Sequence, residues 1–129
     1  MSKKVTGERV RAVGPGELAA TDPTPGILRE LAFSTDRATV IRARVDGGVA
    51  SGWHNHGDRD ALGYVVSGKL RFDFGADGEQ IDVEPQGFFH VPRGVVHRDV
   101  NPIDEPQEIV IAFVGDGPLV VNVDGPPGS

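Results

Sequence analysis

The sequence predicts an all-β fold, either a sandwich or a barrel of short strands. Its 129 residues include 18 glycines and 10 prolines without a regular period, which suits many tight turns better than helices. Strand-like runs alternate with turn signals about every 8–12 residues, a spacing typical of sandwiches and barrels. No segment after residue 35 has convincing helical periodicity. A chain of this length is expected to form one domain with a modest core.

The N-terminal part of the chain is ambiguous. Residues 26–34, GILRELAFS, are compatible with an early strand or with a short turn of helix. We expect residues 1–35 to be an N-terminal extension with the first strand or strands, packed on a barrel formed by residues 36–124. Residues 125–129, which are rich in glycine and proline, are expected to form a flexible tail.

Strand-like runs follow from residue 38 onward. Alternate residues of a strand share a face, so each run can be assigned an inner and an outer side. The longest run is expected to bend at Ser67 and Gly68. The expected strands cover residues 38–45, 49–56, 61–75, 79–84, 88–92, 95–100, 107–114 and 119–123.

Two of these runs have informative faces. In residues 69–74, Leu70, Phe72 and Phe74 alternate with polar residues, so one face is expected to be buried and the other wet. Residues 107–114 are apolar on both faces, as in a strand that is covered on both sides or lies at a subunit interface. We therefore expect a homodimer, because a monomer would expose a large apolar patch.

Charge and composition exclude several classes of function. A formal net charge of −6 argues against binding to nucleic acid or to an anionic membrane surface. The absence of cysteine excludes disulfides and thiolate ligands, so any transition metal must be bound by His, Asp or Glu. No run approaches the ~20 apolar residues of a membrane span, and the charged N-terminus does not resemble a signal peptide. We therefore expect a cytoplasmic protein.

The four histidines, His54, His56, His90 and His97, lie in two neighbouring strand–turn units. His54 and His56 are two residues apart, so on a strand their imidazoles share one face. A His-x-His pair alone does not distinguish a metal site from surface histidines. The clustering of all four histidines favours a metal site.

The two histidine-bearing stretches resemble the two sequence motifs of the cupin superfamily. The first motif, G-x5-H-x-H-x(3,4)-E-x6-G, is matched by Gly48, His54, His56 and Gly68. The second, G-x5-P-x-G-x2-H-x3-N, is matched by Pro92, Gly94, His97 and Asn101. The flanking strands fit the rest of a single cupin domain. The resemblance implies a double-stranded β-helix, a jelly-roll barrel that holds one metal in its mouth.

The sequence departs from the first motif at its glutamate. Ala61 stands at the glutamate position counted from the last glycine of the motif, whereas Asp60 satisfies the spacing from His56. Neighbouring strand residues point to opposite faces, so Asp60 would reach the metal only from an irregular loop, and we expect that it is not a ligand. Asp58 is a weaker candidate. In the second motif Gln86 replaces the first glycine, a change confined to a turn.

By this resemblance, His54, His56 and His97 are the expected metal ligands. Neutral imidazoles suit a divalent transition metal, and three ligands on one side leave two or three positions for water, substrate or dioxygen. Three-histidine sites occur in cupin-like dioxygenases, which favours Fe(II). Zn(II), Mn(II), Ni(II) and Cu(II) also accept nitrogen ligands.

His90 has three open interpretations. It alternates with Phe89 and Val91, so it is a fourth ligand, an acid or base beside the ligands, or a histidine packed between strands. The acid–base role makes it the candidate catalytic residue. Each ligand ring should donate its other N–H to a carbonyl, carboxylate or water, and Asp99, on the same face as His97, is a candidate acceptor.

The resemblance also raises expectations about the cavity. Ala61 and Gly63 are small residues that should leave room beside the metal. Arg42 or Arg44 is a candidate for binding a substrate carboxylate, although an exposed strand edge is the simpler interpretation.

The leading functional interpretation is a small metal-dependent oxidoreductase, such as a dioxygenase, that acts on a small polar organic molecule. The alternative is a module that binds a metal or a small ligand without turnover, which the missing glutamate favours. A third interpretation, a sugar-type isomerase, would require a more polar pocket than the sequence indicates.

Overall fold

The regular elements of the described residues are all β-strands. The computed structural model describes residues 9–21 and 23–128, and within these ranges there is no helix, so no helix is long and apolar enough to cross a membrane. The strands are β1 (Ala19–Ala20), β2 (Ile27–Ser34), β3 (Ala38–Val45), β4 (His54–Asn55), β5 (Asp60–Ser67), β6 (Leu70–Phe74), β7 (Glu79–Val83), β8 (Phe88–Val91), β9 (His97–Val100), β10 (Gln107–Val114) and β11 (Val121–Asn122).

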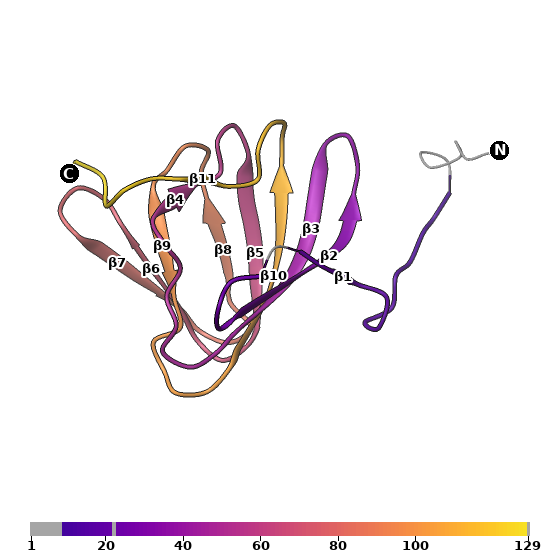
Figure 1. Cartoon of the computed structure of the whole chain (residues 1–129), viewed down its shortest axis with the longest axis horizontal. Helices are drawn as coiled ribbons and strands as arrows, with labels where there is room; N and C mark the ends of the chain where they lie inside the picture. Colours follow the sequence, from indigo (N-terminus) through magenta and orange to yellow (C-terminus); the bar gives the residue numbers. More distant parts are fainter. Residues whose placement is uncertain (1–8, 22, 129) are drawn as a thin grey trace.

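The strands form two antiparallel sheets that face each other. The first has the order β1-β2-β3-β10-β5-β8, and the second has the order β11-β4-β9-β6-β7. The chain crosses repeatedly between the sheets, and after β10 it passes over the end of the barrel to place β11 beside β4 (Figure 1). The predicted all-β double-stranded β-helix is therefore confirmed.

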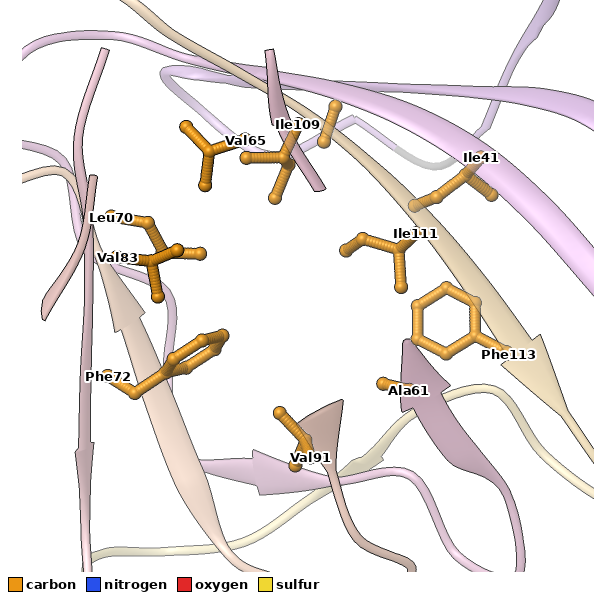
Figure 2. Packing of buried hydrophobic residues seen from close by; sticks show 11 residues of the cluster. Ile41, Ala61, Val65, Leu70, Phe72, Val83, Val91, Ile109, Ile111 and Phe113 are labelled. Atoms are coloured by element: carbon orange, nitrogen blue, oxygen red, sulfur yellow. The ribbon is translucent and has the colours of Figure 1, made fainter. Parts of the chain in front are cut away.

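Apolar side chains from both sheets fill the space between them. In β3 and β10 every second residue is buried, as expected for strands with one face on a core. Val65 of β5 and Leu70 of β6 are fully buried, and each such side chain contributes about 1.5–3 kcal/mol to stability. Figure 2 shows side chains of this cluster pointing inward from the strands that surround it.

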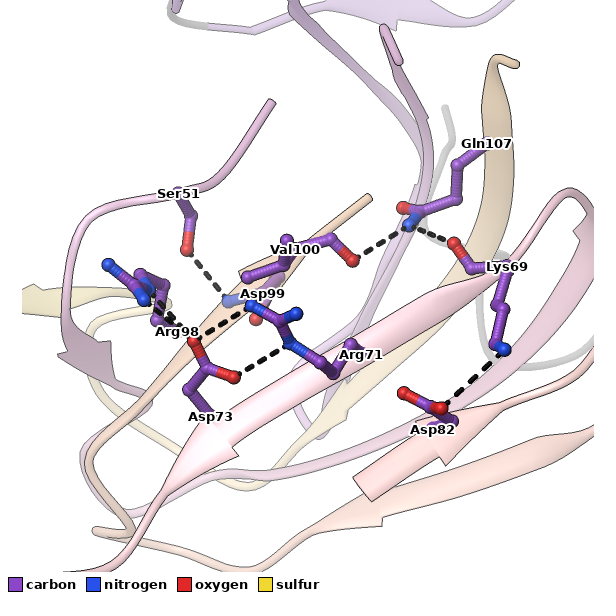
Figure 3. A network of polar contacts seen from close by, with 9 residues as sticks. All are labelled: Ser51, Lys69, Arg71, Asp73, Asp82, Arg98, Asp99, Val100 and Gln107. Carbon is purple, nitrogen blue, oxygen red and sulfur yellow. Dashed lines mark hydrogen bonds and ion pairs between the residues drawn. The ribbon is translucent and has the colours of Figure 1, made fainter. Parts of the chain in front are cut away.

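Polar networks hold the second sheet together on its outer side and at one end. The buried carboxylate of Asp73 in β6 accepts hydrogen bonds from Arg71 at 2.9 Å and from Arg98 of β9 at 2.7 Å (Figure 3). The Arg98 guanidinium also stacks over Trp53, 4.9 Å from its ring centroid. At the end of β9, the Asn101 side-chain amide donates to the carbonyls of Val45, Asp46 and Glu105.

Two predicted runs differ in detail from the strands observed. The run 61–75 is divided into β5 and β6 at Gly68, which has a φ of 79° and whose Cβ would lie 2.6 Å from the Pro106 carbonyl oxygen. The predicted bend is therefore confirmed. Of residues 49–56, only the two residues of β4 form a strand. The segment before β4 contacts β9 through an isolated bridge between Ala50 and Val100.

The first two strands belong to the six-stranded sheet rather than lying on top of it. β2 is a strand, not a helical turn, and it pairs along its length with β3, while β1 pairs with β2 at the sheet edge. In the segment before β1, Arg11 stacks over Phe33 at 5.1 Å. Residues 125–128 lie outside the strands, and the flexibility of this tail stays a prediction.

The prediction of a homodimer rests on the outer face of β10. β10 lies between β3 and β5, so its inner residues Ile109, Ile111 and Phe113 are buried. On the outer side Val110 and Ala112 are half-buried by their neighbours, and Leu62 and Phe88 on adjacent strands are exposed. The apolar part of this face lies beside the ion pairs of Arg42 with Glu30 and Arg44 with Glu108, and the homodimer stays a prediction.

Gln86 offers a test of the turn between β7 and β8. It stands where the second motif has glycine, and it adopts a φ of 69°, which costs a residue with a Cβ about 1 kcal/mol or more. Gln86→Gly should therefore stabilise the protein by about 0.5–1 kcal/mol in urea unfolding. The matched control is Gln80→Gly in the exposed strand β7, which should destabilise it. A loss of stability in Gln86→Gly would contradict the argument.

Candidate metal centre

Three histidines meet at one point inside the barrel. His54 of β4 lies directly opposite His97 of β9 in the strand register, and His56 follows two residues after His54 on the same inner face. All three are buried, with exposed fractions of 7%, 6% and 2%. Their ring centroids lie 4.4–5.0 Å apart. The structure thus brings together the three histidines that the sequence selected.

The outward nitrogen of each ring is bound to a backbone carbonyl. Nδ1 of His54 contacts the Gly52 oxygen at 2.8 Å, Nδ1 of His56 contacts Leu119 at 2.7 Å, and Nδ1 of His97 contacts Val95 at 3.0 Å. A carbonyl only accepts hydrogen bonds, so each Nδ1 carries the proton and each Nε2 keeps a free lone pair. From the sequence Asp99 is one candidate acceptor for His97, but Nδ1 of His97 bonds to the Val95 carbonyl, and Asp99 lies 3.3 Å from Nε2 instead.

The three free nitrogens fit a single divalent transition metal. One ring nitrogen of each histidine lies within 4.8 Å of the other two. Two nitrogens bound to one ion at about 2.0–2.1 Å can be at most about 4.2 Å apart, so small side-chain movements suffice. Three neutral imidazoles, each oriented by a carbonyl, are a donor set that Zn(II), Fe(II) and related ions accept.

Burial favours the neutral, metal-binding form at two of the three imidazoles. It lowers the pKa of His56 to about 4, and it also lowers the pKa of His54 although the Asp99 carboxylate opposes it. Burial acts in the same direction on His97, but the contact with Asp99 outweighs it and raises the pKa of His97. His56 is therefore neutral at physiological pH, and a metal does not compete with a proton there.

The cluster lies on the wall of a cavity of about 570 Å³ between the sheets. Most of the wall is apolar and comes from β3, β5, β8 and β10, and it includes Ala61 and its register partner Phe113. The expectation that Gly63 leaves open space is wrong. A Cβ on Gly63 would collide with the ring of Phe89, so this glycine makes room for a side chain that itself lines the cavity.

The structure places His90 and Asp60 away from the cluster. His90 lies on the outer face of β8, where its Nε2 contacts Asp60 Oδ1 at 2.8 Å, and both side chains are substantially exposed. Phe89 and Val91, its neighbours, line the cavity instead. An acid–base role for His90 beside the metal, or ligation by His90 or Asp60, does not fit this arrangement.

One charged residue of the cavity was missed by the sequence analysis. Arg42 and Arg44 lie on the outer face, paired with Glu30 and Glu108, which fits the simpler interpretation of an exposed strand rather than a substrate contact. Arg29 of β2 lines the cavity, and its Nη1 donates to Thr24 at 2.8 Å. Strand parity from Ile27 would have placed Arg29 inside, had residues 26–34 been assigned as strand.

The lowered pKa of His56 predicts how the metal-free protein responds to acid. The unfolded chain binds a proton at this ring near pH 6.5, whereas the native state does so only near pH 4. Stability should therefore fall as the pH is lowered from about 6.5 to 4. In His56→Gln, urea unfolding should show a smaller fall over this window. A ¹H–¹⁵N NMR titration of the native ring with a midpoint near 6.5 would contradict this.

Several solved structures are similar to this one in fold, although their sequences are 19–23% identical. KdgF from Halomonas sp. is 23% identical, with 84% of this chain and 96% of that chain covered and a TM-score of 0.72. The polyketide cyclase RemF from Streptomyces resistomycificus is 19% identical, with coverages of 92% and 89% and a TM-score of 0.75. Oxalate decarboxylase from Bacillus subtilis is 23% identical, with coverages of 78% and 28% and a TM-score of 0.68. At these identities the likeness establishes the fold.

The family follows from a match to the sequence itself. No curated protein matches the chain. The family model described as the cupin domain matches residues 41–114, more than half of the 129 residues, and this span contains all three clustered histidines. The chain therefore belongs to the cupin family.

Proposed function

We propose that this protein is a metal-dependent enzyme that acts on a small polar organic molecule. The observation that carries the proposal is the convergence of the free nitrogens of His54, His56 and His97 on the wall of a cavity large enough for a small ligand. The three histidines would hold one divalent transition metal. Because all three come from β9, β4 and the residue directly after β4, on one side of the barrel, positions toward the cavity stay open to substrate.

Fe(II) is the metal we propose first, with Zn(II), Mn(II), Ni(II) and Cu(II) as alternatives. When bound, Fe(II) supplies redox chemistry with dioxygen, which makes dioxygenation the first reaction to test. The titles of two structural neighbours name a polyketide cyclase and an oxalate decarboxylase. Cyclisation and decarboxylation therefore belong in the same assay panel.

The chain's own residues have two tasks in this proposal. The apolar wall from the six-stranded sheet excludes water from the space beside the three histidines, which strengthens polar contacts made there. Arg29 is the only lysine or arginine among the described residues that line the cavity, and no described carboxylate pairs with it. Its guanidinium is free to bind a carboxylate or another anionic group of the substrate.

A second function is a binding module that holds a metal or small ligand without turnover. Ala61 favours it, because this position supplies no carboxylate to bind the metal or to move a proton. In either case we also propose that the protein is a cytoplasmic homodimer.

The metal assignment is tested by analysing the protein after purification without chelators. We expect about one divalent metal per chain by mass spectrometry of the elements. His97→Ala should lose most of it because a buried ligand is removed, while His90→Ala, the matched control on the outer face, should keep it. Equal metal loss in both variants, or equal retention, would refute the three-histidine site.

Turnover separates the enzyme from the binding module. The protein is loaded with Fe(II) without oxygen and then mixed with oxygenated buffer and a panel of small acids, diketones and sugars. Substrate-dependent oxygen uptake, or loss of substrate at Fe(II), Mn(II) or Zn(II), supports the enzyme. A full metal complement with ligand binding and no conversion of any compound supports the module.

The role of Arg29 is tested by binding of small carboxylates to the Zn(II)-loaded protein. Removing a charge-assisted hydrogen bond typically costs about 1.5–3 kcal/mol, so Arg29→Gln should weaken binding about tenfold or more. Arg42→Gln, the same substitution on the outer face, should leave the dissociation constant unchanged. Equal affinities of wild type and Arg29→Gln in isothermal titration calorimetry would remove Arg29 from the proposal.

A further inference from the structure

Asp99 places a carboxylate against the histidine cluster. It lies on β9 two residues after His97, so both side chains point into the barrel, and it lines the same cavity. Its Oδ1 lies 3.3 Å from Nε2 of His97 and 4.0 Å from Nε2 of His54. These are the two nitrogens left free once each Nδ1 has bonded to its carbonyl.

Oδ1 of Asp99 is buried and has no hydrogen-bond partner among the described residues. The contrast with Asp73 is direct, because that buried carboxylate is bound by both Arg71 and Arg98. The Asp99 side chain is 30% exposed as a whole, but its Oδ1 faces the cluster, and a buried carboxylate oxygen without a donor favours a cation beside it. No lysine or arginine of the described residues pairs with Asp99, and its Oδ1 instead faces the Nε2 atoms of His97 and His54, where a bound metal would supply the positive charge.

The distances allow Asp99 to bind the same ion as His54 and His97. Two atoms bound at about 2.0–2.2 Å to one metal are about 3.0–3.5 Å apart in neighbouring positions and at most about 4.4 Å apart in opposite ones. The separation of 3.3 Å from His97 fits neighbouring positions, and 4.0 Å from His54 is also within the limit. The backbone N–H of Asp99 donates to the Ser51 hydroxyl at 3.0 Å (Figure 3), which fixes the strand beside β4.

We propose that Asp99 is a fourth metal ligand, through Oδ1, so that the site is composed of three histidines and one aspartate. This inference rests on the proposed metal site and deepens it. The carboxylate comes from β9, two residues after the histidine of the second motif, and replaces the one that Ala61 cannot supply from β5. It leaves the metal with one net positive charge and favours ions that accept mixed nitrogen and oxygen ligands, such as Fe(II), Mn(II) and Zn(II).

The test compares Asp99→Asn with Asp60→Asn, which removes the same charge from the outer face of the same domain. Co(II) is the probe, because its visible absorption bands report the ligands and their number. Asp99→Asn should bind Co(II) about tenfold to a hundredfold more weakly in competition with a chelator, and its absorption bands should shift. Asp60→Asn should match the wild type in both measurements.

Several outcomes would overturn the proposal. Unchanged affinity and unchanged bands in Asp99→Asn would do so, and so would weaker binding with unchanged bands, which indicates a carboxylate beside the metal that does not bind it. Circular dichroism of the metal-free variants controls for folding, and Asp99→Ser provides a second variant if Asp99→Asn does not fold. A wild-type protein that binds no Co(II), with His97→Ala identical to it, would instead refute the proposed metal site and this inference with it.

Discussion

The pairing of β4 with β9 is the constraint on which the candidate site depends. β4 has only two residues, and its single register partner in β9 sets His54 opposite His97. A shift of one residue would turn every side chain of β4 to the other face, so His54 and His56 would point outward and Trp53 inward. The register is held on the other side by β11 and before β4 by reciprocal contacts between Ser51 and Asp99.

The same pairing explains how three imidazoles are buried without a large penalty. Each Nδ1–H reaches a carbonyl, and two of these carbonyls, those of Gly52 and Val95, lie two residues before the histidine they orient. The third, at Leu119, arrives only because the chain crosses the barrel end after β10 (Figure 1). The Nδ1 bonds leave the lone pair of each Nε2 available as a ligand for a cation.

Strand parity predicted much of this arrangement, because the inner and outer faces of a strand follow from local sequence. It placed the histidine pair inward and Trp53 outward, and applied to β8 it would also have placed His90 outward, since Phe89 and Val91 are the apolar pair. It could not assign Arg29, because the strand itself was ambiguous. It also could not separate Val95 from Asp99 as partner of His97, since that choice depends on ring orientation rather than on sequence spacing.

One sheet provides the proposed metal ligands, and the other provides most of the cavity wall. His54 and His56 form one pair at β4 and directly after it, and His97 and Asp99 form another on β9, so every proposed ligand lies on or next to the five-stranded sheet. Arg29 and most of the apolar wall belong to the six-stranded sheet. At Ala61 that wall is flanked by Phe113 and Val91, its register partners, which keep this side apolar. Substitutions in the six-stranded sheet can therefore change which molecule fits the cavity without moving a metal ligand. A carboxylate at position 61 would instead have made β5 contribute both to metal binding and to the shape of the cavity.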